Sequence, residues 1–262
     1  MTTKERYARL IDWFSENMPS PRTELEYDSP FHLLLAVILS AQCTDKRVNM
    51  VTPPLFEAFP DPHSLAAAKE EEVYQFIKSV SFPNNKTRHL IKAARVLVEE
   101  FEGVMPSDID NLMKLPGVGR KTANVMLAVV WEKAAMAVDT HVFRVSNRIG
   151  LTNNSKTPLA TEKTLVKHFP EEILATAHHW LILHGRYVCK ARNPECEDCG
   201  LKDICKTYKT SSKKTGTVKK ATPSKKGGTV KKATQSKKGG TIKKATPSKK
   251  DGTLRLSIRE SK

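Results

Sequence analysis

The sequence Leu115-Pro116-Gly117-Val118-Gly119-Arg120-Lys121-Thr122 decides the fold prediction, because a helical pattern flanks it on each side. Before it, Asp108 can cap a short helix with apolar residues at helical spacing, and after it residues 122–130 are rich in Ala, Val, Leu and Met. The proline ends the first helix, and the two glycines permit backbone angles and close approaches that a side chain forbids. This stretch therefore predicts a helix-hairpin-helix over residues 108–131.

The turn of this hairpin is a candidate phosphate-binding site. The backbone N–H groups of Gly117, Val118 and Gly119 come at the start of a helix, where they and the positive end of the helix dipole attract an anion. One phosphate contact fixes the position of a protein on DNA but reads no base sequence. For an arbitrary Gly-x-Gly, a simple turn is the better interpretation. Lys121 favours the functional alternative, because the helix start disfavours its ammonium form and so helps to make a nucleophile.

The composition indicates a globular protein with a basic C-terminal segment. With 262 residues, 39% of them hydrophobic, the chain can bury a sizeable core. No apolar run reaches the roughly 18 to 20 residues of a membrane span, and the charged, amphipathic N-terminus is not typical of a secretory signal. We therefore expect a cytoplasmic protein. The net charge is +16, but 19 Lys and Arg against 2 Asp and Glu lie from Lys206 onward. Residues 1–205 are thus nearly neutral and must bind DNA through local groups.

Almost every segment up to residue 205 has the periodicity of a helix rather than of a strand. Ser29 can cap, and Pro30 can open, a helix that continues to Leu39, and a second helix over 45–59 must be kinked or broken by Pro53-Pro54. Further helices are predicted over 70–80, 86–101, 139–148, 158–168 and 175–188. The predicted fold class is all-α.

Asp139 is the second candidate for chemistry. It precedes a helix with apolar Val142, Val145 and Ile149, so an N-cap alone would explain it. The alternative is a carboxylate beside Lys121 that activates a water or an amine and balances positive charge on a sugar. We interpret the neighbouring His141 as structural.

Four cysteines, Cys189, Cys196, Cys199 and Cys205, follow one another with the spacing C-x6-C-x2-C-x5-C, while Cys43 stands apart. In a cytosolic chain this pattern favours a metal site over disulfides. Zinc and a [4Fe-4S] cluster both remain open on the residues alone. Lys190 and Arg192, in the x6 loop, are either phosphate contacts or solvated loop charges.

With these residues in place, the chain resembles the endonuclease III family, which are DNA glycosylases and apurinic/apyrimidinic (AP) lyases of the helix-hairpin-helix superfamily. The resemblance covers nearly all of residues 1–207 and includes the four-cysteine loop. It also depends on three further motifs: Leu-Pro-Gly-Val-Gly-Arg-Lys-Thr-Ala-Asn at 115–124, Val-Asp-Thr-His-Val-Phe-Arg-Val at 138–145 and His-Trp-Leu-Ile-Leu-His-Gly-Arg at 179–186.

The resemblance implies a two-lobed, all-helical fold that carries a [4Fe-4S] cluster on the four cysteines and binds damaged double-stranded DNA between its lobes. The implied domains are an N-terminal helix (1–21) that joins the cluster domain, a six-helix barrel (22–134) and the cluster domain (135–207). The composition, and not the resemblance, adds a disordered Lys-rich repeat tail (208–262). The implied protein is a monomer of bacterial type, associated with the nucleoid through DNA.

The resemblance also assigns roles to four residues. Lys121 matches the amine that attacks the sugar C1′ of a flipped-out nucleotide, and Asp139 matches the carboxylate that assists it. Gln42 matches the residue that fills the gap left by the flipped base, although an amide bonded to nearby backbone is the simpler alternative. Phe82 would be the wedge in the opposite strand. Here the sequence Ser81-Phe82-Pro83 departs from the Gly-Leu-Tyr-like turn of the family, which leaves the shape of this loop open.

After Tyr208 the chain continues with three twelve-residue repeats rich in lysine, which cannot bury a core. They are either a polycationic arm that attracts DNA or a solubilising tail. The predicted function is excision of oxidised pyrimidines such as thymine glycol, followed by strand cleavage through β-elimination. Two alternatives are an adenine glycosylase for mispairs without lyase activity, against which Lys121 argues, and a non-catalytic DNA-binding protein, against which Lys121 and Asp139 together argue.

Overall fold

The computed structural model of the protein describes residues 1–215. In this range the regular elements are helices, without a strand, which confirms the all-α prediction. None of the described helices is both long and apolar enough to cross a membrane. The elements are α1 (Thr3–Asn17), α2 (Pro30–Ser40), α3 (Asp45–Ala58), α4 (Pro62–Ala66), α5 (Glu70–Ile77), α6 (Pro83–Phe101), α7 (Ile109–Leu112), α8 (Arg120–Val130), α9 (Thr140–Ile149), α10 (Pro158–His168), the 3-10 helix η1 (Glu171–Ile173), α11 (Leu174–Tyr187) and α12 (Lys206–Thr215).

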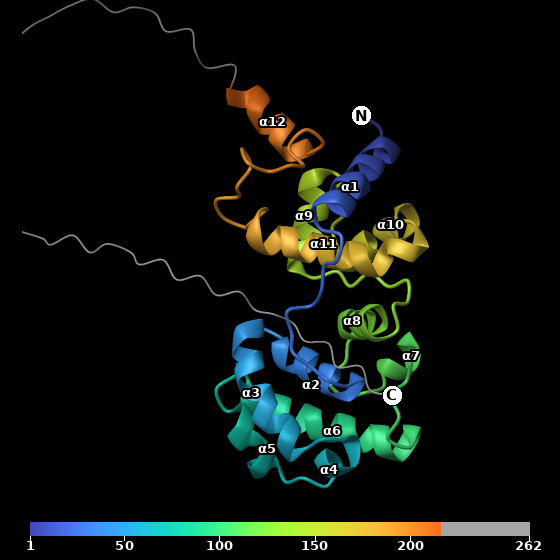
Figure 1. The fold of residues 1–262 in the computed structure, drawn as a ribbon, viewed down its shortest axis with the longest axis vertical. Helices are drawn as coiled ribbons and strands as arrows, with labels where there is room; N and C mark the ends of the chain where they lie inside the picture. The colour runs from blue at the N-terminus through green and yellow to red at the C-terminus, as the bar shows by residue number, and fades with distance from the viewer. Residues whose placement is uncertain (216–262) are drawn as a thin grey trace, which may run out of the picture. The chain divides into compact units, whose positions relative to one another are not determined.

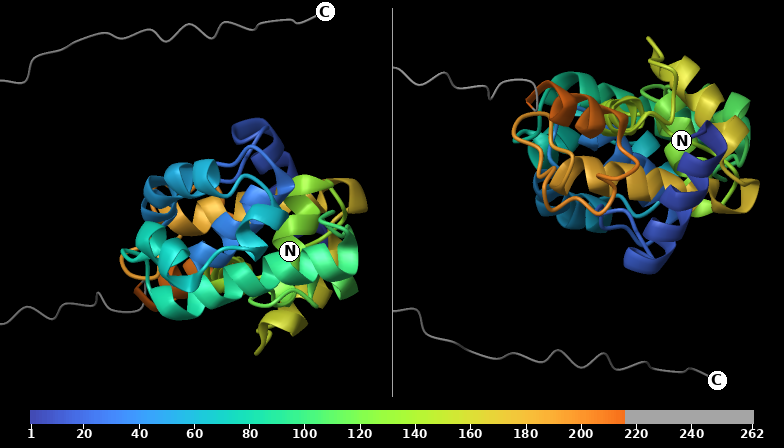
Figure 2. Two further views of the ribbon diagram at one scale, coloured as in Figure 1. Left: turned by 90° about the horizontal axis from the view of Figure 1, so that it is seen from below. Right: turned by 90° about the horizontal axis from the view of Figure 1, so that it is seen from above.

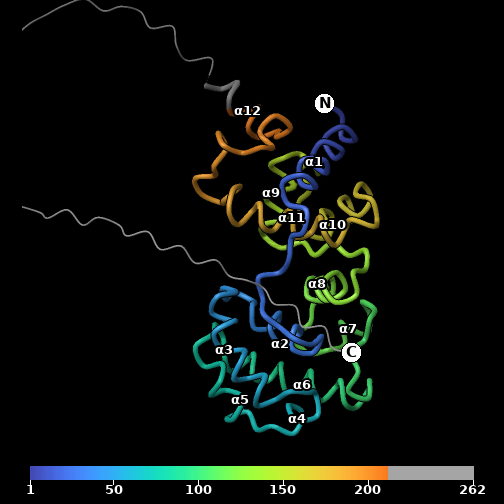
Figure 3. The backbone as a smooth tube through the Cα atoms, in the orientation of Figure 1, coloured from blue at the N-terminus to red at the C-terminus, as the bar shows by residue number. Residues whose placement is uncertain are grey.

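The helices gather around two separate clusters of buried hydrophobic side chains. Helices α2 to α8 surround one cluster and are called the first lobe; α1 and α9 to α11 surround the other and, together with α12, which contacts α9, are called the second lobe (Figure 1). The segment between α1 and α2 runs from the second lobe to the first, as the backbone tube shows (Figure 3). The domain limits drawn from the sequence remain a prediction.

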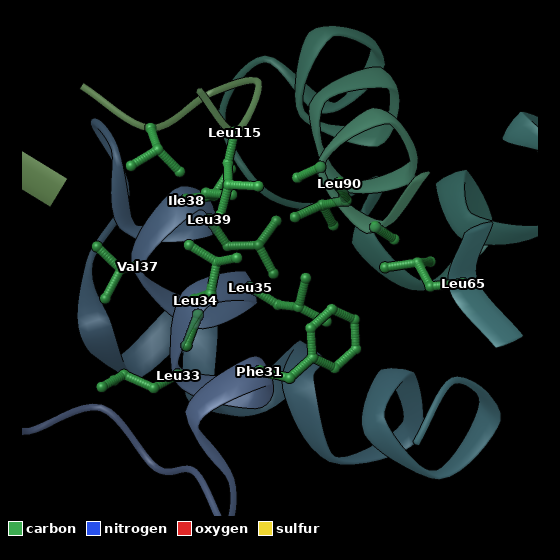
Figure 4. Close-up of a cluster of buried hydrophobic side chains, with 14 of the residues drawn as sticks. Phe31, Leu33, Leu34, Leu35, Val37, Ile38, Leu39, Leu65, Leu90 and Leu115 are labelled. Atoms are coloured by element: carbon green, nitrogen blue, oxygen red, sulfur yellow. The ribbon is translucent and has the colours of Figure 1, made fainter. Parts of the chain in front are cut away.

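Helix α2 forms the centre of the first lobe. All residues from Phe31 to Leu39 are buried, so this helix is covered on every side. Leu90 of α6, Leu65 of α4 and Leu115 of the hairpin lie around it (Figure 4). Full burial of one such leucine stabilises the fold by about 1.5–3 kcal/mol. The hairpin is therefore anchored to the core of the first lobe by the residue directly before its turn.

Helix α6 supports α2 from the side. It contacts α2, α4 and α5, and the view from below shows it extended along one side of the lobe (Figure 2). Its apolar positions recur at helical spacing, and the buried ones include Leu90, Ile91, Ala94 and Leu97. The periodicity that predicted the helix is the periodicity of its buried face.

The N-terminal helix α1 packs in the second lobe, far along the chain from its neighbours. The Tyr7 hydroxyl donates to the backbone oxygen of Leu151 (3.0 Å), and the Trp180 indole donates to the backbone oxygen of Met18 (2.7 Å). A Cβ on Gly200 would lie 2.3 Å from the Trp13 indole nitrogen, so the cysteine-containing loop can approach α1 closely because residue 200 is glycine. Helix α1 thus supports the cysteine loop.

Two details differ from the sequence-based expectations. Of the two expected effects of Pro53 and Pro54, a break is absent, because helix α3 continues through both; both prolines are exposed, so the carbonyl groups that lose a donor on that side are open to water. The tail was expected to begin at residue 208, but α12 continues to Thr215. Contacts with residues distant in the chain hold the start of this helix: the Thr207 hydroxyl donates to the Arg148 backbone oxygen (2.9 Å) and the Tyr208 hydroxyl to Glu197 (2.8 Å). The rest of the predicted tail lies outside the described residues.

Candidate active site

The hairpin has the local structure that its residues predict. The Asp108 carboxylate caps α7 by accepting from the Asn111 amide (2.9 Å). The turn is closed by the Val118 amide, which donates to the Leu115 oxygen (3.0 Å). This corrects the expectation that all three amides of the turn are free, because the turn itself uses the Val118 N–H. The amides of Gly117 and Gly119 meet no backbone acceptor in the described part of the chain.

The two glycines of the turn are required for different reasons. Gly117 has a φ of +86°, and a Cβ there would lie 3.0 Å from Cβ of His89. Gly119, the N-cap of α8, has a φ of −93°, which any residue adopts, and a Cβ there would meet nothing within 4 Å. Neither strain nor crowding within the protein therefore explains Gly119. The open space in front of it leaves room for another molecule to approach the backbone at the start of α8.

Lys121 and Asp139, the two residues that the sequence offered as candidates for chemistry, line the same hollow between the lobes. Lys121 is exposed in the first turn of α8, and Asp139 is half-buried at the start of α9. A buried amide joins their two segments, since Asn124 of α8 donates to the Met136 backbone oxygen (3.3 Å). The hollow is further lined by Arg22, Thr23, Glu24, Leu25, Val37, Ser40, Asp45, Val125, His178, His179, Ile182, Leu183 and Arg186.

Asp139 is also the N-cap of α9. Its Oδ1 accepts a hydrogen bond from the Val142 amide at 2.7 Å. The capping interpretation is therefore correct, and it does not compete with the functional one, because a carboxylate has a second oxygen and further lone pairs. The cap fixes the orientation of the side chain, and the charge is stabilised at the helix N-terminus. The neighbouring His141 contacts Arg144 through its Nδ1 (3.1 Å), in agreement with a structural role.

His178 is a residue of the hollow that the sequence-based reasoning did not single out. It is 1% exposed, and its Nδ1 is buried without a hydrogen-bond partner in the described structure. Burial, followed by the repulsion of His179, Lys121 and Arg186, lowers the pKa of His178 to about 3. The imidazole is therefore neutral at physiological pH and adds no positive charge beside Lys121. The only signal in the sequence for a role of His178 was its position directly before the motif at 179–186, and no local pattern indicated that its side chain is buried.

An ionic cluster also lines the hollow. Arg186 of α11 binds Asp45 of α3 (2.5 Å) and Glu24 of the segment between α1 and α2. The Tyr187 hydroxyl also contacts Glu24. Helix α11 belongs to the second lobe, so this cluster joins the two lobes across the site.

Gln42 and Phe82 lie in two loops that meet. Both residues have left-handed backbone angles, with φ of 54° and 56°. Gln42 is exposed, and Phe82 has 60% of its surface exposed although it is aromatic. The Ser81 hydroxyl donates to the backbone oxygen of Gln42 (2.7 Å). The structure thus brings together two residues that are 40 positions apart and that the resemblance assigned to the DNA helix.

The four cysteines line one hollow of the second lobe, together with Ile149, His184, Val188 and Leu201. All four thiols are free of disulfides. Arg148 lies 3.6 Å from the Cys189 sulfur through Nη1, and the Cys199 sulfur lies 3.8 Å from Nε2 of His184. No three His, Cys, Asp or Glu side chains of residues 1–215 converge as ligands of one ion would. The residues instead offer four thiols around a largely apolar hollow with a cation beside it, which fits an anionic cluster.

The two cations of the cysteine loop differ in whether their charge is free to contact a phosphate. Lys190 is paired with Glu195 of the same loop (2.5 Å), whereas Arg192 is exposed. The pairing favours the interpretation of Lys190 as a loop charge, and Arg192 is the better placed of the two for a phosphate.

Comparisons with known proteins agree with this geometry. The family model of the HhH-GPD superfamily of base excision DNA repair proteins matches residues 35–171, and that of the iron-sulfur binding domain of endonuclease III matches 189–205. Endonuclease III of Rickettsia conorii is 46% identical over 200 residues, 76% of this chain and 95% of that protein. Endonuclease III of Bacillus subtilis is 43% identical over 80% of this chain and 95% of that protein. A solved structure of a trapped endonuclease III–DNA covalent intermediate is 44% identical, with a TM-score of 0.77, and covers 81% of this chain and 100% of that one.

Proposed function

The chain belongs to the endonuclease III family of base excision DNA repair proteins, and on that premise we propose that Lys121 is its nucleophile and Asp139 the carboxylate that assists it. The protein is a bifunctional DNA glycosylase and AP lyase and carries a [4Fe-4S] cluster. The observation that supports the proposal is that these two side chains, from separate helix starts, line one hollow between the lobes.

In this mechanism the neutral amine of Lys121 attacks C1′ of the damaged nucleotide, and the bond from C1′ to the base breaks. Asp139 accepts a proton of the attacking amine and stabilises the positive charge that develops on the sugar. The sugar ring then opens: the bond from C1′ to O4′ breaks, O4′ takes up a proton, and a Schiff base between C1′ and the Lys121 nitrogen results. This Schiff base acidifies the C2′ proton, and its removal breaks the bond from C3′ to oxygen, so that β-elimination releases the 3′ phosphate. The amine must be neutral to attack, and the uncharged ring of His178 keeps the local positive charge low beside it.

The substrates are oxidised pyrimidines. The hollow that Lys121 lines also presents Ser40, Asp45 and Arg186, which offer donors and acceptors to the polar edges of such a base. A target base inside a duplex cannot reach this wall, so it must be flipped out of the stack. Gly117 and Gly119 would hold a phosphate at the start of α8, and Gln42 and Phe82 would enter the duplex from the crossing loops.

The four thiolates of Cys189, Cys196, Cys199 and Cys205 would hold the cluster, with Arg148 beside it as a counter-charge. When bound, the cluster supplies iron–sulfur bonds that cross-link a loop of 17 residues with little regular structure. One chain contains both Lys121 and Asp139, so a monomer suffices, and it would act on DNA in the nucleoid. Arg192 is the cation of this loop that we propose for a phosphate contact.

Borohydride trapping tests the nucleophile and the substrate together. The protein is mixed with a duplex that carries one thymine glycol, and borohydride reduces any Schiff base to a stable covalent bond. We expect a covalent complex for the wild type and none for Lys121→Ala. Lys114→Ala is the matched control, because Lys114 is an exposed lysine just before the hairpin turn and should leave trapping intact. Release of the base without a trapped complex would reject Lys121 as nucleophile.

A further inference from the structure

The loops that carry Gln42 and Phe82 hold strained backbone conformations. Left-handed angles are uncommon for residues other than glycine and are unfavourable for a bulky residue such as Phe82. Neither residue gains from the strain within the protein: Phe82 caps α6 without a side-chain hydrogen bond, and both side chains are exposed. Such strain persists where neighbouring contacts impose it.

Two side chains supply these contacts. The ammonium of Lys86 donates to the backbone oxygens of Leu39 and Ala41, each at 2.7 Å. Both oxygens lie at the C-terminal end of α2, where carbonyl groups lack helical partners and a cation is favoured. The Ser81 hydroxyl donates to the next carbonyl, that of Gln42 (2.7 Å). Three successive contacts therefore join the start of α6 to the loop that follows α2.

Lys86 is an unusual residue for this purpose, because it is only 5% exposed. Burial lowers its pKa, and none of the ion pairs within residues 1–215 includes it. A buried ammonium without a carboxylate is costly, so backbone carbonyls must satisfy it. The Lys86 ammonium thus holds the C-terminal end of α2 in place.

From these contacts we infer that Lys86 and Ser81 are positioning residues that hold Gln42 and Phe82 as one preformed pair for entry into the duplex. The inference rests on the proposed function of the two residues. Insertion of a side chain between bases requires unstacking, and ordering two free loops at the same time would further weaken binding. A pair that is ordered before binding avoids that second cost. The same three hydrogen bonds then hold the backbone of both strained residues in place.

Binding to a lesion analogue tests this inference. The probe is a duplex with a tetrahydrofuran abasic-site analogue opposite 2-aminopurine, whose fluorescence reports entry of a side chain beside it; an undamaged duplex of the same length is the comparison. Ser81→Ala should bind the analogue about three- to tenfold more weakly, as expected for the loss of one hydrogen bond, and Lys86→Met, which loses two, should bind it at least as weakly as Ser81→Ala. Both should show a smaller fluorescence change and bind undamaged DNA as the wild type does.

Controls separate positioning from general destabilisation. Ser81→Thr keeps the hydroxyl and should restore binding, and Lys92→Met removes an exposed lysine of the same helix and should have no effect. In a Gln42→Ala background, Ser81→Ala should cause a smaller loss than it does in the wild type, because part of its effect acts through Gln42. Should Lys86→Met fail to fold, the Ser81 variants still decide the matter.

The inference is overturned if the Ser81→Ala and Lys86→Met variants bind the analogue as the wild type does, if both duplexes lose affinity equally, or if the effects of Ser81→Ala and Gln42→Ala add fully. Failure of the proposed function would give a different result: the wild type itself would then trap no abasic duplex with borohydride. That result would remove the basis of the inference, whereas wild-type trapping with unaffected variants would reject the inference alone.

Discussion

Replacement of Asp139 by asparagine separates its two roles, because asparagine caps a helix as well as aspartate does. The amide oxygen can accept from Val142, as Asp139 does at 2.7 Å. What is lost is the charge at the start of α9, which is worth about 0.3–1 kcal/mol of stability. For a protein of this size such a loss lowers Tm by about 1–4 °C. The loss of a catalytic acid–base group, by contrast, slows a reaction about 10²- to 10⁴-fold.

The assay combines far-UV circular dichroism melting with single-turnover release of thymine glycol from a duplex. Asp139→Asn should melt near the wild type yet release the base at least about 10²-fold more slowly. Asp139→Ala should be equally slow and should also lose about 1 kcal/mol of stability for the missing cap. Thr157→Ala is the matched control: Thr157 caps α10 by accepting from Ala160 (3.2 Å), so its loss should lower Tm and leave the rate unchanged.

One pattern would refute this reasoning. If Asp139→Asn released the base at the wild-type rate, while Asp139→Ala lost activity only in proportion to its unfolding, the carboxylate would be a cap and nothing more. Asp139 would then have no part in the chemistry, although it lines the hollow beside Lys121.

Three further predictions follow from burial, ligation and charge. The unfolded chain takes up a proton at His178 below about pH 6.5, whereas the folded protein does so only near pH 3. As the pH falls between these values, the free energy of unfolding should therefore decrease by up to about 1.4 kcal/mol per pH unit. His178→Gln should lose less stability over the same range, and an equal loss would show that the ring is solvated in the folded protein. Cys199→Ser should lose the visible absorbance and iron of the cluster, whereas Cys43→Ser should keep both; retention of iron by Cys199→Ser would contradict the ligand assignment. Deletion of 216–262 should flatten the dependence of log Kd on log salt by about 0.9 for each lost phosphate contact and leave single-turnover rates unchanged, and an unaltered slope would exclude a DNA role for the repeats.

Local chemistry explains what could be predicted from the sequence. Ser29, Asp108 and Asp139 cap the helices they precede, through hydrogen bonds that span three residues. Such contacts depend on neighbours in the chain and are therefore visible in it. The same holds for the apolar periodicity of α6 and for the spacing of the four cysteines, which the family model of the iron-sulfur domain covers.

Contacts between distant segments could not be predicted in this way. Arg186 binds Glu24 and Asp45 across more than 140 residues of chain, and no pattern in one segment reports the other. Lys86 appeared to be an ordinary polar residue at a helix start, yet the fold buries it against the end of α2. The end of α12 was missed because its anchor is equally remote: Thr207 is held by the Arg148 carbonyl.

The central claim is that the Lys121 amine forms the covalent bond to the sugar. The most direct test is to reduce the complex of wild-type protein and thymine glycol duplex with borohydride, digest it with protease and nuclease, and locate the sugar remnant by tandem mass spectrometry. We expect one modified peptide, with the remnant on Lys121. A remnant on another lysine or on the N-terminal amine would contradict it, even if the protein released the base and cleaved the strand.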